Sequence, residues 1–496
     1  MALLAGVVAL FVLVIWPANA ESHHAGELTL EPYSFETFDG ASHPAELGRL
    51  WVPENRSRKS DRLIQLALVR LKSSAAKPRS PVVFLAGGPG IPATTLGRVP
   101  VYYQLFEKVL AFADVILADQ RGIGMSSPNT QCPEGPPAPA DALQSESRFR
   151  EALVARARAC AGYWRGRGLD LASYSSAESV DDLEDLRTAL GAGKLSLLGH
   201  SYGATLALVA VKSHAEHLDR VVLAAGSAPD QSPHLPLVSD FALRRLSGQA
   251  ATAAELHGAF PDTYGDFRRA VAQLDRDPLT VLVHAGPNKP PVEIRAGAFP
   301  VQFVVNEMLA NGRKVERIPA LVASLTHRDT SLLSSNVEDL YELLSSGFSA
   351  MQFAIPCADG WPAGRRQLAL QQATQSVFGG APFVHLDPRL CKAVGVASPP
   401  GDTLLQSWSS VPALLVSGTL DSNSPAFQSG EILWGLGNGV SLTVENGFHE
   451  TLPAPEVQAV VTEFLGGANI RSSTVRFAPP AFLTVEEARQ TPQVAH

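Results

Sequence analysis

Short apolar runs alternate with amphipathic segments over the first half of the chain. The runs have the length of buried strands and are bounded by Gly, Pro or Asp. They cover residues 63–72, 81–86, 115–118, 194–198 and 220–224. Residues 179–190 carry acids in the first turn and leucines along one face, which is typical of an amphipathic helix. Apolar strands that alternate with helices predict a mostly parallel, doubly wound α/β sheet.

The pattern changes between about residues 231 and 400. This stretch contains helix-like segments, such as 301–309 and 337–344, with proline-containing joints and no clean series of strands. Apolar runs of strand length return at 411–417 and 440–444, and a helix-like segment follows at 455–465. We therefore expect a core in two parts that is interrupted by a helical insertion. The expected units are the core parts 21–230 and 401–470, a helical cap or lid at 231–400, and a surface-wrapping tail at 471–496.

The N-terminal segment has the pattern of a secretory signal peptide. Residues 1–16 are almost wholly apolar, and the small residues Ala18 and Ala20 precede Glu21. Small residues placed in this way after a short apolar run predict a signal peptide, residues 1–20, cleaved after Ala20. We expect a secreted or periplasmic protein with no stable membrane insertion after cleavage. No Lys or Arg precedes the apolar run, so an uncleaved N-terminal anchor is the alternative.

Four cysteines bear on the same question. Cys132, Cys160, Cys357 and Cys391 allow three pairings, and proximity along the chain favours Cys132–Cys160 and Cys357–Cys391. An oxidising compartment would keep such pairs joined. Free buried cysteines are the alternative.

The composition favours a large folded core and excludes other classes of protein. Of 496 residues, 45% are hydrophobic and 18% are charged, which is too little charge for a disordered chain. The net charge of −8 leaves no basic face for nucleic acid. No phosphate-binding loop, dinucleotide fingerprint or zinc-ligand spacing occurs, so we expect no cofactor and no metal. The oligomeric state does not follow from the sequence.

The segment Gly199-His200-Ser201-Tyr202-Gly203 points to nucleophilic chemistry. It follows the expected strand at 194–198 and precedes a helix-like run at 204–212. A serine on such a tight strand-to-helix turn is exposed as a nucleophile, and glycine is needed two residues to either side to avoid a clash. The alternative is a purely structural turn. The position between a strand and a helix favours the nucleophile elbow.

A serine nucleophile needs a base, and the base needs an acid to orient it. Asp421 directly follows the expected strand at 411–417, and His449 follows the strand at 440–444. Chemistry in α/β sheets gathers at the carboxyl ends of the strands, so we expect Ser201, Asp421 and His449 to form a catalytic triad in that order. Asp402 and Glu445 are weaker candidates for the acid.

Donors for a developing oxyanion are expected at two places. Gly87-Gly88-Pro89-Gly90 follows the expected strand at 81–86, and Tyr202 comes immediately after the nucleophile. In α/β hydrolases the backbone N–H groups at these two points bind the oxyanion, so we assign Gly88 and Tyr202 to it, with Gly87 as the alternative donor from the glycine segment. A simple tight turn is the alternative for the glycine segment.

These motifs together resemble the prolyl and tripeptidyl aminopeptidase branch of the α/β-hydrolases, the S33-type serine peptidases. The resemblance rests on Gly87–Gly90, on Asp119-Gln120-Arg121-Gly122 with Gly124 and Ser126, and on the elbow around Ser201. It covers residues of about 60–230 and 405–470, and residues 174–208 are similar to the secreted tripeptidyl aminopeptidases. It implies an α/β-hydrolase fold with a helical cap over the site. It also implies a secreted serine hydrolase that releases residues from peptide N-termini through an acyl-enzyme.

The chain departs from this family at two points. Ala86 stands where many relatives have His, and the cap carboxylates that bind the substrate amine are not evident. Glu307, Glu342 and Asp359 are candidates, with solvated helix charges as the alternative for each. The substrate is therefore expected to be a peptide or a small ester. A carboxylesterase acting on small or xenobiotic esters is the second hypothesis, and a non-catalytic binding protein on the same fold is the third.

Overall fold

The computed structural model describes residues 23–491, except 59–61, 233, 285–289 and 400–407. The expected signal peptide at 1–20, the alternative acid Asp402 and the end of the tail lie outside the described residues. In the part of the chain that is described, no helix is both long and apolar enough to cross a membrane.

A ten-stranded sheet forms the centre of the core, in the order β1-β2-β3-β5-β4-β6-β7-β10-β11-β12. From β5 to β12 all neighbours are parallel, which confirms the predicted mostly parallel sheet. The strands are β1 Leu28–Glu36, β2 Ser42–Pro53, β3 Leu63–Leu71, β4 Val82–Leu85, β5 Val115–Ala118, β6 Leu195–His200, β7 Leu218–Ala224, β10 Ala413–Gly418, β11 Gly439–Glu445 and β12 Ser473–Arg476.

One strand differs from the expectation. The run at 63–72 was expected to be a parallel strand, but β3 pairs antiparallel with both β2 and β5. An apolar run indicates that a strand is buried, but it does not indicate whether the strand runs parallel or antiparallel to its neighbours. The short connection between β2 and β3 turns the chain back, so that β3 lies antiparallel to β2.

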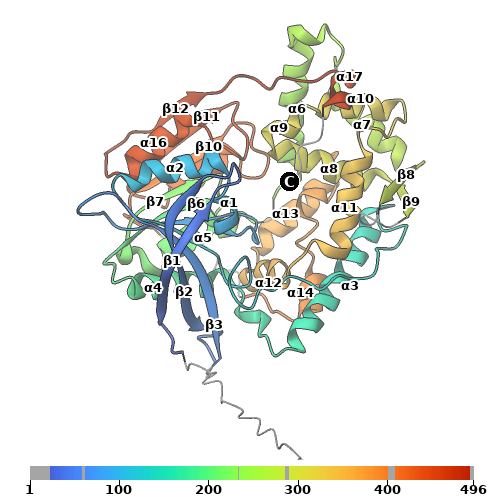
Figure 1. Ribbon diagram of the computed structural model, residues 1–496. Helices are drawn as coiled ribbons and strands as arrows, with labels where there is room; N and C mark the ends of the chain where they lie inside the picture. The colour runs from blue at the N-terminus through green and yellow to red at the C-terminus, as the bar shows by residue number, and fades with distance from the viewer. Residues whose placement is uncertain (1–22, 59–61, 233, 285–289, 400–407, 492–496) are drawn as a thin grey trace, which may run out of the picture.

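Helices cover both faces of the sheet (Figure 1). Leu197 packs with α4 and α5 on one face, whereas its neighbour Leu198 packs with α2 and α16 on the other. Because successive strand residues point to opposite faces, a strand covered on both sides is apolar throughout. The core helices are α1 Ala93–Leu96, α2 Pro100–Leu110, α4 Ser176–Ala189, α5 Tyr202–His214, α15 Ala426–Leu433 and α16 Pro455–Leu465.

A layer of helices lies to one side of the sheet, and most of it comes from the chain between β7 and β10 (Figure 1). It also contains a two-stranded hairpin that the sequence pattern did not indicate. Every second residue of β8 is solvent-exposed, and one of these exposed positions is the apolar Leu282, which weakens the alternation in the sequence. The elements are α6 Pro236–Thr252, α7 Thr263–Leu274, β8 Leu279–His284, β9 Pro291–Ala296, α8 Ala298–Ala310, α9 Gly312–Val315, α10 Ile318–Thr326, α11 Ser334–Ser346, α12 Ala350–Asp359, α13 Ala363–Ala373 and α14 Pro388–Val394.

Helix α3, Glu146–Arg165, belongs spatially to this layer although it precedes β6 in the chain. Phe149 and Leu153 share one apolar cluster with Phe299 and Val304 of α8. In Figure 1 the teal α3 lies among the yellow and orange helices. A helix assigned by chain order to the first core part therefore completes the helical layer.

Two disulfides fasten the helical layer, and they follow the pairing that chain proximity favoured. Cys132–Cys160 joins the segment after β5 to α3, and Cys357–Cys391 joins α12 to α14.

The C-terminal tail does more than cover the surface, because β12 adds a strand to the sheet edge. Helix α17, Val485–Gln490, then packs against the helical layer, where Arg317 donates to the carbonyl of Thr491 over 2.9 Å.

Candidate active site

Ser201 lies on the turn between β6 and α5, at φ 55° and ψ −122°. This backbone conformation is unfavourable for a non-glycine residue and is typical of strained functional turns. A Cβ on Gly203 would lie 1.9 Å from the carbonyl oxygen of Leu85, and one on Gly199 would lie 2.5 Å from the carbonyl oxygen of Gly203. The glycine requirement inferred from the sequence therefore has a direct steric cause.

The structure brings Ser201, His449 and Asp421 together. The Ser201 hydroxyl donates to Nε2 of His449 over 2.8 Å, and Nδ1–H of His449 donates to Oδ2 of Asp421 over 2.9 Å. Asp421 follows β10 and His449 follows β11, two adjacent parallel strands. The other Asp421 oxygen, Oδ1, accepts from the backbone N–H groups of Asn423 and Ser424 over 2.8 and 2.9 Å.

Burial and the neighbouring groups together set the pKa values of Asp421 and His449. Burial disfavours the ionised form of Asp421, but His449 and the two backbone donors outweigh it and hold the pKa of Asp421 below its usual value. Burial likewise disfavours a charged His449, but Asp421, together with Glu450 and Glu307, raises the pKa of His449 above its usual value. A charged imidazole is thus stabilised at this position, as a proton-accepting base requires.

The alternative acid Glu445 lies away from His449 in the described part of the chain. Glu445 lies at the end of β11 and forms an ion pair with Arg476 of β12 over 2.7 Å, on the outer edge of the sheet. Asp402 is outside the described residues.

Gly88 and Tyr202 both line the space in front of Ser201. A Cβ on the adjacent Gly87 would lie 2.8 Å from the Cβ of Ser201, so the glycine segment passes directly beside the serine. Tyr202 is the first residue of α5, where a backbone N–H has no acceptor within the helix. Both segments therefore lie next to Ser201.

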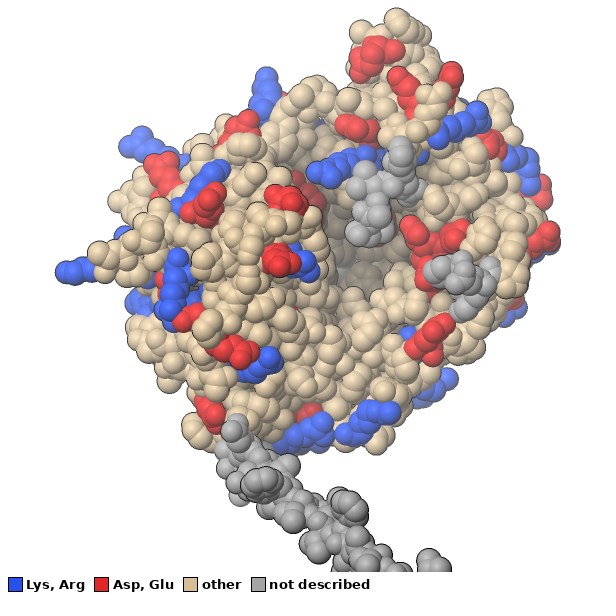
Figure 2. Space-filling model, viewed as in Figure 1, with Lys and Arg blue, Asp and Glu red and all other residues tan. Residues whose placement is uncertain are grey.

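A cavity of about 740 Å³ opens between the sheet and the helical layer, and it contains Ser201 and His449. Figure 2 shows the surface hollowed between these two halves of the molecule. The volume of this cavity is in the range of sites that bind a small ligand or a short peptide segment. The apolar part of its wall includes Leu153, Leu208, Phe303, Leu343, Phe348, Phe353 and Leu386.

Two of the three candidate carboxylates line this cavity. Glu307 of α8 is exposed to it. Partial desolvation by the surrounding protein raises the pKa of Glu307, while Asn306, Lys314 and His449 act in the opposite direction. Asp359 also faces the cavity, and burial raises its pKa to about 6. Glu342 is exposed on α11 and is not among the described residues that line the cavity.

Asp359 connects the helical layer to the nucleophile turn. Its Oδ1 accepts from the backbone N–H of Ser176 over 2.8 Å, and its Oδ2 accepts from the Ser176 hydroxyl over 2.5 Å. The Tyr202 hydroxyl lies 2.8 Å from the same serine oxygen. The side chain of Tyr202 is therefore linked through Ser176 to the carboxylate of Asp359 on α12.

Sequence reasoning missed two histidines that line the cavity. His234 donates through Nδ1 to the carbonyl of Asn423 over 2.7 Å, and burial lowers its pKa. Burial, with His234 and Arg150, lowers the pKa of His385 to about 4. Both rings are neutral near pH 7 and offer hydrogen bonds without charge. No motif marks either residue, because each comes from an irregular segment of the helical layer.

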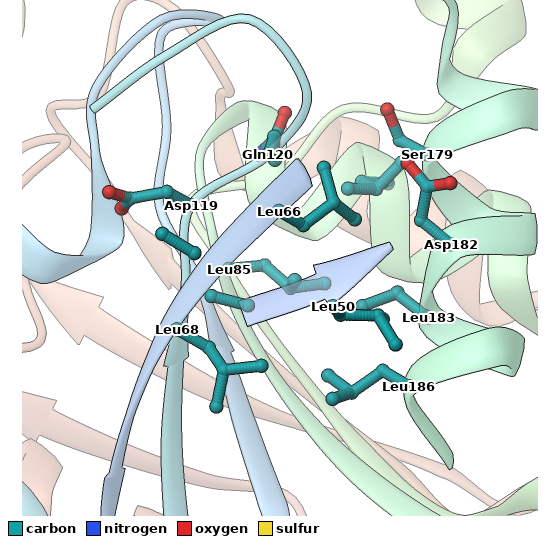
Figure 3. Close-up of a pocket in the computed structure, with 13 residues that line it drawn as sticks. Leu50, Leu66, Leu68, Leu85, Asp119, Gln120, Ser179, Asp182, Leu183 and Leu186 are labelled. Carbon is teal, nitrogen blue, oxygen red and sulfur yellow. The ribbon is translucent and has the colours of Figure 1, made fainter. Parts of the chain in front are cut away.

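A second cavity, of about 30 Å³, lies inside the core between the sheet and α4 (Figure 3). Leu50, Leu66 and Leu85 line it, with Gln120 and Ser179 at its polar end. It has room for about one water molecule and none for a substrate. The larger cavity is therefore the candidate active site.

Comparison with known proteins shows which proteins this chain resembles. Residues 80–283 match the model of the family described as the alpha/beta hydrolase fold. The serine protease Hip1 of Mycobacterium tuberculosis is 27% identical over 194 residues, which are 38% of this chain and 36% of that protein. The tripeptidyl aminopeptidase of Streptomyces lividans is 26% identical over 196 residues, 36% of this chain and 35% of the relative.

A third relative matches a longer segment. The proline iminopeptidase of Arabidopsis thaliana is 25% identical over 272 residues, 54% of each chain. The matched segments thus span between about a third and a half of these relatives. Among solved structures, the proline iminopeptidase of Mycobacterium smegmatis aligns with 84% of this chain and 97% of its own, at 15% identity and a TM-score of 0.37. The matched family model and the sheet topology show that the chain has the α/β-hydrolase fold, and over part of its length it resembles serine peptidases and proline iminopeptidases.

Proposed function

We propose that the protein is a serine hydrolase that releases residues from peptide N-termini through an acyl-enzyme. The observation that carries this proposal is the hydrogen-bonded series from Ser201 through His449 to Asp421, with separations of 2.8 and 2.9 Å, beside a large open cavity. A hydrogen-bonded nucleophile, base and orienting acid form the arrangement that acyl transfer requires.

In the first half of the reaction, Ser201 Oγ attacks the scissile carbonyl carbon while Nε2 of His449 accepts its proton. Asp421 stabilises the imidazolium that results. The carbonyl oxygen becomes an oxyanion, to which the backbone N–H groups of Gly88 and Tyr202 donate. His449 then gives its proton to the leaving amine, the C–N bond breaks, and Ser201 is left acylated.

In the second half, water replaces the amine. His449 accepts a proton from the water as its oxygen attacks the ester carbonyl, and a second oxyanion forms in the same position. Its collapse returns the proton to Ser201 Oγ and releases the new carboxylate. The chemistry needs no group beyond those named.

Preference for a free N-terminus is proposed to come from Glu307 and Asp359. Both carboxylates line the cavity that contains Ser201, and a substrate ammonium in a partly desolvated space is bound most favourably next to a carboxylate. The apolar wall would enclose the side chains of the residues to be released. A cavity of about 740 Å³ accommodates more than a single residue.

A carboxylesterase is the second candidate, and the apolar wall is the observation that favours it. Esters and amides pass through the same tetrahedral intermediate, so this hydrogen-bonded series does not separate the two. A non-catalytic binding protein is the third candidate. A binding protein does not require a serine in a strained backbone conformation that donates a hydrogen bond to a histidine. The presence of this serine therefore disfavours the third candidate.

Export to an oxidising compartment is part of the proposal. The two disulfides support it, since such bonds persist outside the reducing cytosol. The mass of the protein recovered from the producing cells tests it, and a chain that begins at Glu21 is expected.

The decisive experiment compares substrates on one enzyme preparation. Nitroanilides of single amino acids and tripeptides with free N-termini are compared with the same compounds carrying a blocked N-terminus, and with nitrophenyl esters. Turnover of the free peptides, its loss on blocking and its absence in Ser201→Ala support the proposal. Ester turnover without amide turnover contradicts it and favours the carboxylesterase.

A further inference from the structure

Two helices of the core bring a second group of chemically active side chains together, away from the cavity. Asp181 and Glu184 lie three residues apart on α4. His214 is the last residue of α5, and His217 ends the short 3₁₀ helix η2, Ala215–His217. None of the four is among the described residues that line the cavity with Ser201. The proposed reaction does not use them.

The four side chains face one another in two pairs. Nε2 of His214 lies 3.1 Å from Oδ1 of Asp181, and Nδ1 of His217 lies 3.0 Å from Oε2 of Glu184. One atom each from Glu184, His214 and His217 lies within 4.8 Å of the other two. The two imidazole rings are nearly parallel, with an interplanar angle of 9° and centroids 6.4 Å apart. Nitrogen and oxygen lone pairs therefore converge on one small volume.

Arg187 orients one of the carboxylates. Its Nη2 donates to Oε1 of Glu184 over 2.5 Å, and its Nε donates to Oε2 over 2.9 Å. The hydrogen bonds from Arg187 hold the pKa of Glu184 below its usual value, and His217 adds to the effect. Glu184 is consequently ionised at neutral pH and fixed in place, as carboxylate ligands of metals commonly are. The guanidinium charge also repels a cation, which limits the affinity of any such site.

We propose that Asp181, Glu184, His214 and His217 form a binding site for a divalent transition metal ion, with Zn²⁺ as the best chemical match. Two imidazole nitrogens and two carboxylate oxygens make up a donor set that suits Zn²⁺, whereas Ca²⁺ and Mg²⁺ prefer oxygen ligands only. Tetrahedral zinc places its ligand atoms about 3.4 Å apart. The paired atoms at 3.0 and 3.1 Å would move slightly apart, and the atoms of Glu184, His214 and His217, which lie within 4.8 Å of one another, would draw together to reach that spacing.

The side chains are partly exposed, with side-chain solvent exposures between 24% and 43%, so an ion can enter from solvent without unfolding of the helices. Binding would replace the two hydrogen bonds to the imidazoles by metal bonds. It would also cross-link α4 to the end of α5, the helix that begins directly after Ser201. The site would stabilise the framework of the nucleophile turn and take no part in the chemistry.

The test is a Zn²⁺ titration of the full-length, untagged protein after treatment with a chelator. Calorimetry is expected to give one equivalent of bound Zn²⁺, and Zn²⁺ is expected to raise the Tm by roughly 2–4 °C. The double variant His214→Ala/His217→Ala should lose both effects. His327→Ala removes an exposed histidine at the end of α10 and should keep them. Unchanged stoichiometric binding in the double variant, or no binding by the wild type, overturns the proposal.

Two further measurements keep the result clear if the double variant is unstable. Glu184→Gln keeps the side-chain volume and should weaken binding at least tenfold. Substituted Co²⁺ should give the visible spectrum of a tetrahedral site in the wild type and lose it in His217→Asn. None of these measurements uses activity, so the outcome is independent of the proposed hydrolase function.

Discussion

The Tyr102 hydroxyl donates a hydrogen bond to Oε2 of Glu450 over 2.8 Å, which fixes a carboxylate immediately beside His449. Nε2 of His200 lies 3.5 Å from the same oxygen. Burial opposes ionisation of Glu450, but the imidazoles of His200 and His449 and the Tyr102 hydroxyl outweigh it and hold the pKa of Glu450 below its usual value. A second negative charge, besides that of Asp421, therefore acts on His449.

We predict that Glu450→Gln moves the acid limb of reactivity to lower pH. The carboxylate helps to raise the pKa of His449, so its removal lets His449 lose its proton at lower pH. The rate of labelling by a fluorophosphonate probe as a function of pH measures this without a known substrate. Tyr102→Phe retains the charge of Glu450 and should shift the limb less. An unmoved limb in Glu450→Gln would show that Glu450 does not act on His449.

Removal of the nucleophile or the base should abolish turnover while the protein remains folded. Ser201→Ala and His449→Ala are each expected to lower kcat by something on the order of 10⁴–10⁶, because Ser201, His449 and Asp421 act as a unit. Labelling by the fluorophosphonate should vanish in Ser201→Ala. Persistence of labelling in that variant would place the nucleophile elsewhere.

Asp359→Asn should weaken binding of substrates with a free N-terminus. The pKa of Asp359 is about 6, so the wild-type carboxyl is charged above that pH and neutral below it. The KM for free peptides should therefore fall as the pH rises through 6 in the wild type, and this dependence should be absent in Asp359→Asn. Peptides with a blocked N-terminus serve as the control, since their KM should change little. Equal effects on both kinds of peptide would assign Asp359 a structural role alone.

The same substitution should change the pH dependence of stability. A carboxyl whose pKa is higher in the folded than in the unfolded chain binds more protons when folded, so stability falls as the pH rises through the window that ends at about 6. Asp359→Asn removes this contribution and should flatten the stability curve across that window. Urea unfolding at a series of pH values provides the measurement.

Gly203→Ala should disrupt the turn that carries Ser201. The added methyl group would lie 1.9 Å from a backbone oxygen that has no freedom to move, and we expect a loss of about 3 kcal/mol in the free energy of unfolding. Gly193→Ala is the matched control, because a Cβ there meets no atom within 4 Å. Chemical denaturation of both variants measures the difference. Similar stability in the two would contradict the steric account.

Loss of the Cys357–Cys391 disulfide should affect both stability and substrate binding. Replacement of both cysteines by serine is expected to cost about 2–4 kcal/mol, because the unfolded chain gains freedom. Cys357 precedes Asp359 by two residues on α12, so KM for free peptides should rise as well. The corresponding change at Cys132 and Cys160 is the control, expected to reduce stability with less effect on KM.

The sequence by itself determined the parts of this protein that depend on local chemistry and chain order. Ser201 was identifiable because it lies between a predicted strand and a predicted helix and has a glycine two residues to either side. This pattern is typical of a nucleophile turn. Asp421 and His449 were identifiable as site residues because each follows a strand, and parallel strands carry their carboxyl ends to one edge of the sheet. The two disulfide pairings followed from closeness along the chain.

Only the tertiary structure decided which side chains from distant segments share one space. Glu307 and Asp359 line the cavity and Glu342 is not among the described residues that line it, although all three lie on helices of the same layer. Helix α3 joins a layer that otherwise follows β7, and His214 meets Asp181 from another helix. An amphipathic pattern shows that a helix packs on one face, but it does not specify the surface that this face meets. Packing between distant segments selects that surface, and no single segment encodes it.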